Sequence, residues 1–306
     1  MKDPLSRTRL VSRRLLPITA VIVALALIVA ASWIAAAQQP PALSPHDLVL
    51  RTVQNETKTA SAPAKYMLLA RKETVQGSQT KLMVETRDAM AAIVVAYNDH
   101  PLNPQQRQEE NARVERFLQN PAELRRKQEQ EKQTSERIVQ IMKALPDAFV
   151  YEYDGNEVSS PGVGKPGNEL VRLKFRPNPK YDPPSRVEQV LTGMQGYLLI
   201  EPNQHRIAKI DGVLAKDVGF GWGILGHLDR GGHFLVEQGD VNNGDWEITR
   251  MALTFTGRIL LFKSLNIKST EVFSDFSPAD PNLTFAQGLE LLKKQEATLT
   301  ANRQQK

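Results

Sequence analysis

The chain has 306 residues, of which 41% are hydrophobic and 24% are charged, and it contains no cysteine. This composition excludes a disordered polyelectrolyte, and the missing cysteine excludes a disulfide scaffold, thiol catalysis, cysteine-ligated zinc and a lipidated cysteine. The formal net charge is +5, from 39 basic and 34 acidic side chains. Residues 1–37 hold five of the basic groups and one acidic group, so the rest of the chain carries only +1. A nearly neutral body does not favour a nucleic-acid partner.

The N-terminal segment has the three parts of an export signal. A basic region, Lys2–Arg14, precedes an apolar run over residues 18–37, which ends in small residues before a polar stretch. This pattern predicts a signal peptide over residues 1–37 that is cleaved between Ala37 and Gln38. The apolar run is also about long enough to span a bilayer, so an uncleaved inner-membrane anchor over residues 18–37 stays open as the alternative. Both alternatives place the body of the protein in the periplasm or another extracytoplasmic compartment.

The rest of the chain is predicted to contain a linker, one domain and a short tail. Residues 38–43 are rich in proline and glutamine and form the linker. Residues 44–300 form a single domain, in which residues 103–144 are a highly charged helical insertion. Residues 301–306 are a polar tail.

Helix starts are marked by capping residues. Ser44, Asn103 and Asn120 are each followed by proline, which is typical of the first residue of a helix. Thr284 and Gln287 have the spacing of a capping box that begins a C-terminal helix. The helices of the insertion carry both signs of charge, which favours a solvated surface over a nucleic-acid interface.

Strands account for most of the remaining elements. Short connections between them predict an antiparallel meander. A slip in the alternation between Ile248 and Met251 predicts a β-bulge, and Thr256-Gly257 is interpreted as the turn of a hairpin. The run from Ile259 to Phe262 is apolar on both faces, so a covering layer of helices is expected. The predicted strands are residues 66–73, 81–87, 90–97, 148–154, 169–175, 196–201, 206–214, 235–240, 246–255, 258–262 and 263–272.

Motifs of known chemistry are not complete in this sequence. His227 and His233 lie six residues apart across a Gly-Gly pair, which is not a zinc-binding helical spacing. The glycine-rich stretch before Lys165 lacks the Ser or Thr of a phosphate loop, because Pro166 stands there. Residues 219–223 do not keep the glycine spacing of a dinucleotide loop. No enzyme activity, metal or cofactor is therefore expected, and a hydrolase that uses the two histidines is the weakest alternative.

Two segments resemble those of bacterial lipoprotein-sorting-like proteins. Gly196–Pro202 with His205–Gly212 is similar to a strand and turn of that family, and Asp245–Phe262 is similar to the paired strands that follow. The resemblance implies an α+β fold, with a strongly curved antiparallel sheet, an incomplete β-barrel, whose concave side is covered by helices. It also implies that this side receives acyl chains. The charged insertion is a departure from the simplest members of the family.

The leading hypothesis is an exported, non-enzymatic protein that binds a lipid or a lipoprotein acyl chain on the concave face of the sheet. An apolar lining of seven residues is predicted. They are Phe220, Trp222, Trp246, Leu253, Phe255, Leu260 and Phe262. The alternative is an interaction or scaffold module of the cell envelope, which uses residues 103–144 as a docking arm for a protein partner. Contact with the membrane is expected through the N-terminal segment if it is not cleaved.

Overall fold

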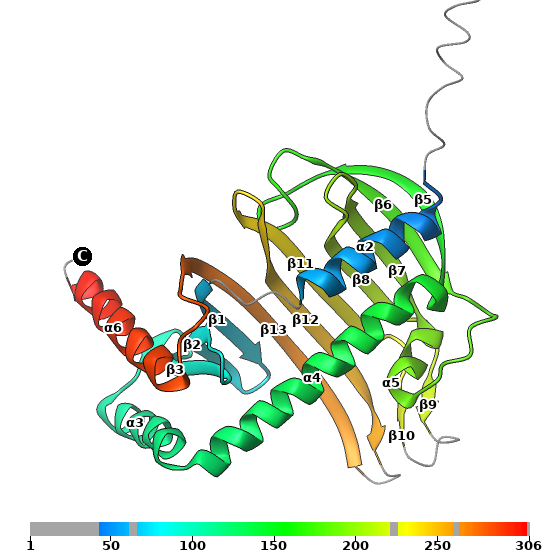
Figure 1. The fold of residues 1–306 in the computed structure, drawn as a ribbon. Helices are drawn as coiled ribbons and strands as arrows, with labels where there is room; N and C mark the ends of the chain where they lie inside the picture. The colour runs from blue at the N-terminus through cyan, green and yellow to red at the C-terminus, as the bar shows by residue number, and fades with distance from the viewer. Residues whose placement is uncertain (1–42, 61–65, 221–225, 260–262, 305–306) are drawn as a thin grey trace, which may run out of the picture. The chain divides into compact units, whose positions relative to one another are not determined.

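The computed structural model describes residues 43–60, 66–220, 226–259 and 263–304. The chain divides into two compact units, residues 1–43 and 44–306, and the described residues belong almost entirely to the second. That unit is an open, curved antiparallel sheet with helices, which confirms the predicted α+β class (Figure 1). The predicted signal peptide and its cleavage site at Ala37 and Gln38 lie outside the described residues.

The sheet consists of 13 strands in the described ranges. Its order is β4-β3-β2-β1-β13-β12-β11-β8-β7-β6-β5, while β10 pairs with β12 and β9. Two meanders therefore meet where β1 pairs with β13. The strands are β1 (Tyr66–Thr74), β2 (Gly77–Glu85), β3 (Met90–Tyr97), β4 (His100–Pro101), β5 (Phe149–Val158), β6 (Glu169–Pro177), β7 (Met194–Glu201), β8 (Arg206–Leu214), β9 (Val218–Phe220), β10 (Gly226–Leu228), β11 (His233–Asn242), β12 (Asp245–Ile259) and β13 (Lys263–Pro278).

The helices begin where the sequence predicts. Ser44 and Asn103 accept hydrogen bonds from backbone N–H groups of the following turn, and Asn120 caps the next helix in the same way. Thr284 and Gln287 form the predicted capping box, with reciprocal side-chain bonds to each other's backbone N–H. The helices are α2 (Pro45–Thr59), α3 (Pro104–Gln119), α4 (Pro121–Ala148), α5 (Arg186–Gln189) with the 3-10 turn η1 (Val190–Gly193), and α6 (Phe285–Gln304).

Two helices extend past predicted boundaries. The insertion continues as helix past residue 144 to Ala148, and the C-terminal helix continues to Gln304, so residues 301–304 belong to a helix rather than to a tail. Burial explains the first extension, because Ala144, Leu145 and Ala148 pack into the core. Tertiary contacts of this kind stabilise a last turn that the local sequence does not specify.

The predicted hairpin at Thr256-Gly257 is wrong, since β12 runs through both residues without turning. Gly257 pairs with Leu265 of β13 on one side and with Leu228 of β10 on the other. A Cβ atom at this position would collide with the carbonyl oxygen of His227. The glycine therefore permits a close approach of two backbones. The predicted bulge is confirmed, because Thr249 is the extra residue between two consecutive pairs of the β11–β12 ladder.

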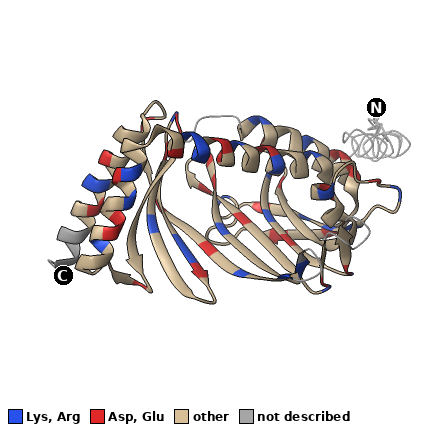
Figure 2. Cartoon of the chain, turned by 90° about the horizontal axis from the view of Figure 1, so that it is seen from below, with Lys and Arg blue, Asp and Glu red and all other residues tan. Residues whose placement is uncertain are grey.

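Residue pairing defines two faces of the sheet. One row of directly paired residues runs across seven strands. Its members are Tyr151, Phe175, Gly196, Gly212, Phe234, Leu253 and Ser269. Directly paired residues point to the same face, and the Tyr151 hydroxyl donates a hydrogen bond of 2.7 Å to the Leu145 carbonyl of α4. We call this side the inner face; α2 packs against α4 there, and both helices lie across the sheet (Figures 1 and 2).

The opposite side, which we call the outer face, carries α6 at one end of the sheet. Phe285, Leu289 and Leu292 of α6 are buried against side chains of β1, β2 and β3. Leu82 and Val84 of this cluster lie on the outer face, because they alternate with Lys81, which pairs with Ala70 of the inner face. The two ends of the curved sheet are thus packed on different faces.

The insertion connects β4 at one edge of the sheet to β5 at the other, and it also covers the edge strand β3. The Glu110 carboxylate accepts a hydrogen bond of 2.7 Å from the Val94 N–H, and Arg113 donates one of 2.7 Å to the Ala92 carbonyl. Glu131 of α4 accepts a bond of 3.0 Å from the Met90 N–H. These side chains bind the backbone groups that an edge strand leaves unpaired.

Glu110→Ala is expected to lower the free energy of unfolding by about 2 kcal/mol, because a buried N–H and an arginine lose a charged partner. Urea denaturation measures the change. Glu109→Ala is the matched control, because Glu109 is exposed and its carboxylate bonds only the exposed Gln105 amide among the described contacts. Equal stability of the two variants would show that the carboxylate of Glu110 does not support the edge of the sheet.

Candidate functional site

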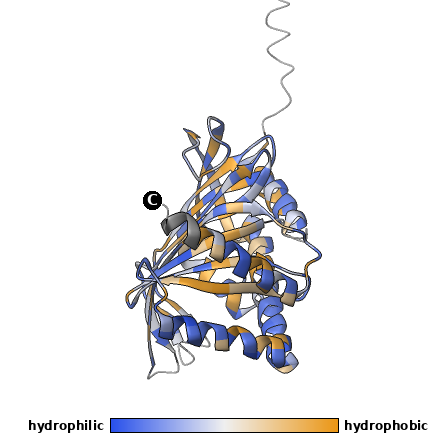
Figure 3. Cartoon of the chain, turned by 90° about the vertical axis from the view of Figure 1, so that its left-hand side faces the viewer, coloured by the Kyte–Doolittle hydropathy of each residue, from blue (hydrophilic) through white to orange (hydrophobic). Residues whose placement is uncertain are grey.

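The central strands of the sheet are amphipathic. Most of their inner-face side chains are apolar, with Gln238, Ser269 and Glu271 as exceptions. The side chains that alternate with them on the outer face are mostly polar or charged, and Figure 3 shows both kinds along the strands. This alternation indicates that the inner face should be covered and the outer face solvated. The apolar inner-face residues of β11, β12 and β13 are Phe234, Val236, Met251, Leu253, Phe255, Leu265, Ile267 and Phe273.

The inner face of these three strands is only partly covered in the structure. None of its apolar side chains is fully buried; all are half-buried except Ile267, which is 38% exposed. By contrast, Leu198 and Ile200 of β7 are 2% and 0% exposed, and Leu289 under the other end of the sheet is 1% exposed. An apolar surface between two packed regions is therefore accessible, and such surfaces on soluble domains usually mark binding sites.

Charges on the outer face of the same strands are paired with one another. Glu237 lies between Lys209 and Arg250 along a row of paired residues, at 3.4 Å from the lysine and 3.8 Å from the arginine. Lys209 also lies 3.7 Å from Asp211. These ion pairs are typical of a solvated surface. The outer face of these strands therefore differs from the inner face, whose side chains are mostly apolar.

Two of the seven predicted lining residues lie together on the inner face of β12. Leu253 and Phe255 are both half-buried there. Phe220 is half-buried at the end of β9. Trp222, Leu260 and Phe262 lie outside the described residues.

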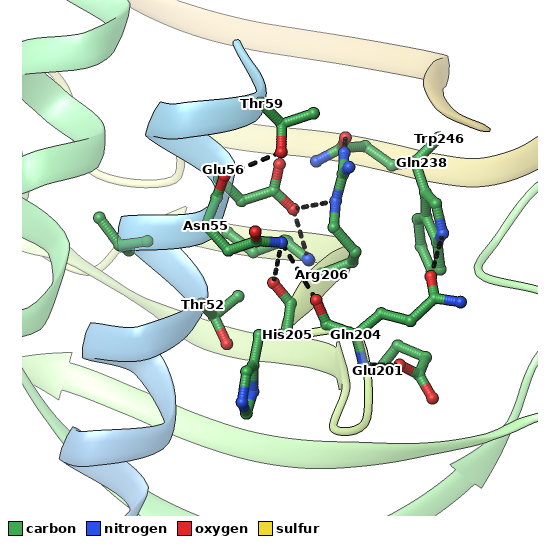
Figure 4. A network of polar contacts seen from close by, with 12 residues as sticks. Thr52, Asn55, Glu56, Thr59, Glu201, Gln204, His205, Arg206, Gln238 and Trp246 are labelled. Carbon is green, nitrogen blue, oxygen red and sulfur yellow. Dashed lines mark hydrogen bonds and ion pairs between the residues drawn. The ribbon is translucent and has the colours of Figure 1, made fainter. Parts of the chain in front are cut away.

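Trp246 has different surroundings from Leu253 and Phe255. It is 6% exposed and packs with Leu199 and Ala208 in a core cluster. Its indole N–H donates a hydrogen bond of 2.7 Å to the Gln204 side chain, as Figure 4 shows. The structure therefore places Trp246 in the framework of the β7–β8 turn.

A buried ion pair holds α2 against this turn. Arg206 Nε lies 2.9 Å from Glu56 Oε1, and the same carboxylate accepts the Ile207 N–H at 2.7 Å (Figure 4). Asn55 donates to the carbonyls of Gln204 and His205. Burial raises the pKa of Glu56, and Arg206 and the Ile207 N–H oppose that shift. The network fixes a helix that crosses the inner face.

Sequence reasoning missed several inner-face residues, among them Phe234, Val236 and Met251. The signal was present, because Phe234 and Val236 alternate with polar His233 and Glu237 in the period of a half-buried strand. The predicted strand began at residue 235, two residues late, and the first alternating residue fell outside it.

The candidate histidines each contact an aspartate. His227 Nε2 lies 3.1 Å from Asp229, and His233 Nε2 lies 2.9 Å from Asp211. Within the described ranges, no group of three or more His, Asp or Glu side chains is arranged to hold a metal ion.

A second candidate site is a hollow with a mixed lining. It has a volume of about 480 Å³ between α4 and the segment around α5, and Gln140, Tyr181 and Glu188 contribute to its wall. The Gln140 amide donates to the Glu188 carboxylate at 3.1 Å. Val139, Ala144 and Pro184 also line this hollow. The inner face presents a larger set of apolar side chains and is therefore the stronger candidate site for an apolar ligand.

The fold and the site together define the class: an open antiparallel sheet with an incompletely covered apolar inner face. A DUF1329 family protein from Desulfovibrio piger, known as a crystal structure, is a structural match with a TM-score of 0.28 and 13% sequence identity. The match covers 79% of this chain and 94% of that chain. No family model matches the sequence, and no curated protein matches it. The comparisons name no enzyme.

In the described ranges, no helix has both the length and the apolar character for crossing a bilayer. The alternative anchor over residues 18–37 lies outside those ranges.

Proposed function

We propose that this protein is an exported, non-enzymatic carrier that binds a lipid or a lipoprotein acyl chain on the inner face of its sheet. The observation that carries the proposal is the row of apolar side chains on β11, β12 and β13 that no element of the described chain buries fully. Such a surface gains about 0.8 kcal/mol for each CH₂ group that it removes from water.

The N-terminal segment supports the cellular setting of the proposal. A basic region, an apolar run and small residues before Gln38 are the features of an export signal. The resemblance of Gly196–Pro202 and Asp245–Phe262 to lipoprotein-sorting-like proteins supports the ligand class.

The arrangement of α2 and α4 supports reversible loading. Both helices lie on the inner-face side, and α4 contacts β5, α2 and α5 near one end of the sheet. Ile138 in the middle of α4 is 57% exposed, so this helix has apolar surface that is not committed to the core. An acyl chain between α4 and the central strands would bury both surfaces.

The test is to purify the protein from the periplasm, or from the other extracytoplasmic compartment that contains it, and to extract any bound lipid. Organic extracts of the wild-type protein are expected to contain lipid in stoichiometric amount by mass spectrometry. Purified apoprotein is expected to take up single-chain lipid from vesicles. Extracts without lipid, together with no uptake from vesicles, would refute the proposal.

A further inference from the structure

A lysine interrupts the apolar inner face near one end. Lys81 of β2 pairs with Ala70 of β1 and with Val94 of β3, and both partners are buried, at 2% and 4% exposed. Ala70 in turn pairs with Phe273 of β13, which belongs to the apolar inner face. Lys81 is therefore half-buried on the inner face, in the same row of paired residues as Phe273.

Among the described residues, no carboxylate oxygen lies within 4.0 Å of the Lys81 ammonium, and only the more distant charges of Glu271 and Glu110 favour its charged form. The two nearest carboxylates have other partners. Glu271 pairs with Lys72 at 4.0 Å. Glu110 forms an ion pair with the Arg113 guanidinium at 2.7 Å and accepts a hydrogen bond from the Val94 N–H. Lys81, Lys72 and Arg113 thus outnumber the two carboxylates and leave one positive charge unbalanced.

An unbalanced, half-buried ammonium beside an apolar surface is unfavourable in the free protein. Burial lowers the pKa of Lys81, and the nearby positive charges of Arg113 and Lys72 lower it further, while the charges of Glu271 and Glu110 oppose the shift. An anionic group at this position would gain a charge-assisted hydrogen bond and restore neutrality. The physical chemistry thus favours a ligand with a negative charge at one end.

We propose that the inner face selects amphiphiles with an anionic head group, whose carboxylate or phosphate binds Lys81 while the alkyl chain lies across β1, β13 and β12. This inference rests on the proposed function and specifies its ligand class. From Lys81 on β2 to Ile210 on β8 there are five spacings between neighbouring strands, or about 24 Å. This distance is long enough for a single extended acyl chain, which would pass beside Glu271, the inner-face carboxylate that pairs with Met251 of β12.

The test compares three probes of equal chain length by isothermal titration calorimetry: dodecanoate, dodecyl phosphate and 1-dodecanol. The wild-type protein is expected to bind at least one of the anions about tenfold more tightly than the alcohol, as one charge-assisted hydrogen bond allows. The tighter of the two anions identifies the head group. Lys81→Met is expected to remove this preference and to leave the affinity for 1-dodecanol within about a factor of two.

Lys268→Met is the matched control, because Lys268 of β13 is exposed and pairs with Thr254 on the outer face. This variant should keep the preference of the wild-type protein, and Lys81→Arg should also keep it. Equal affinity of the wild-type protein for the alcohol and both anions would overturn this inference and leave the proposed function standing. Failure to bind any of the three probes would count against the proposed function itself.

Discussion

Leu253→Glu is expected to weaken acyl-chain binding about a hundredfold, while Thr254→Glu leaves it unchanged. Leu253 is half-buried on the inner face between Phe234 and Ser269, whereas its neighbour Thr254 is exposed on the outer face. The first substitution removes an apolar contact and places a carboxylate where the alkyl chain should lie. Together these effects cost about 3 kcal/mol, which is about two factors of ten in affinity. Titration with a fluorescent fatty acid measures both variants.

The comparison of affinities requires that both variants fold as the wild-type protein does. Because Leu253 is only half-buried, its replacement should lower the free energy of unfolding by no more than about 1.5 kcal/mol. Thermal unfolding of both variants provides that control. If Leu253→Glu folds and binds as well as Thr254→Glu does, the ligand does not lie on the inner face.

Arg206→Met is expected to lower the free energy of unfolding by about 3–5 kcal/mol at neutral pH, since it leaves the Glu56 carboxylate buried without its cation. Arg250→Met is the control, because Arg250 is exposed on the outer face and lies 3.8 Å from Glu237. Loss of this ion pair should lower the free energy of unfolding by less than about 1 kcal/mol. Urea denaturation at several pH values measures both effects.

The pH dependence separates the loss of the ion pair from a loss of packing. Burial raises the pKa of Glu56 above its ordinary value of 4.5. A carboxyl whose pKa is raised on folding contributes stability at pH values below 4.5 and loses it as pH rises through the folded pKa. Removing Arg206 raises that pKa further. The stability difference between variant and wild type should therefore shrink as the pH is lowered toward 4.5. A difference that is constant with pH would contradict this account of Arg206.

Local features of the fold were predictable because a few neighbouring residues determine them. Ser44, Asn103 and Asn120 cap helices through side-chain oxygens that bind backbone N–H groups of the next turn, so proline after each of them marks the start. The bulge at Thr249 was visible as a slip in the alternation. Strand identities followed from the period of apolar residues.

Long-range features were not predictable from local pattern. Tyr66 of β1 pairs with Pro278 of β13, more than 200 positions away, and nothing near either residue indicates that the two meanders meet there. Thr256-Gly257 has the composition of a turn. In the structure, however, the absence of a Cβ atom at Gly257 allows the backbone of β10 to approach β12 closely. Glu110 and Arg113 look like an ordinary helix pair, and only the edge of β3 beside them reveals their second role.

The candidate site was predictable only in part. Leu253 and Phe255 were found because they alternate on a strong strand. Trp246 is predicted as part of the same lining, but the structure gives its indole N–H a partner in Gln204 and buries its ring. Lys81 was not identified at all, because its significance depends on which carboxylates are already paired in three dimensions.

Photo-crosslinking with a fatty acid that carries a diazirine on its alkyl chain tests the central claim most directly. Labelled peptides, mapped by mass spectrometry, are expected to contain inner-face residues of β11, β12 and β13, such as Val236 and Met251. Excess unlabelled fatty acid should suppress this labelling. Labelling confined to outer-face residues such as Arg250 and Lys268, or labelling that excess ligand does not reduce, would contradict that claim.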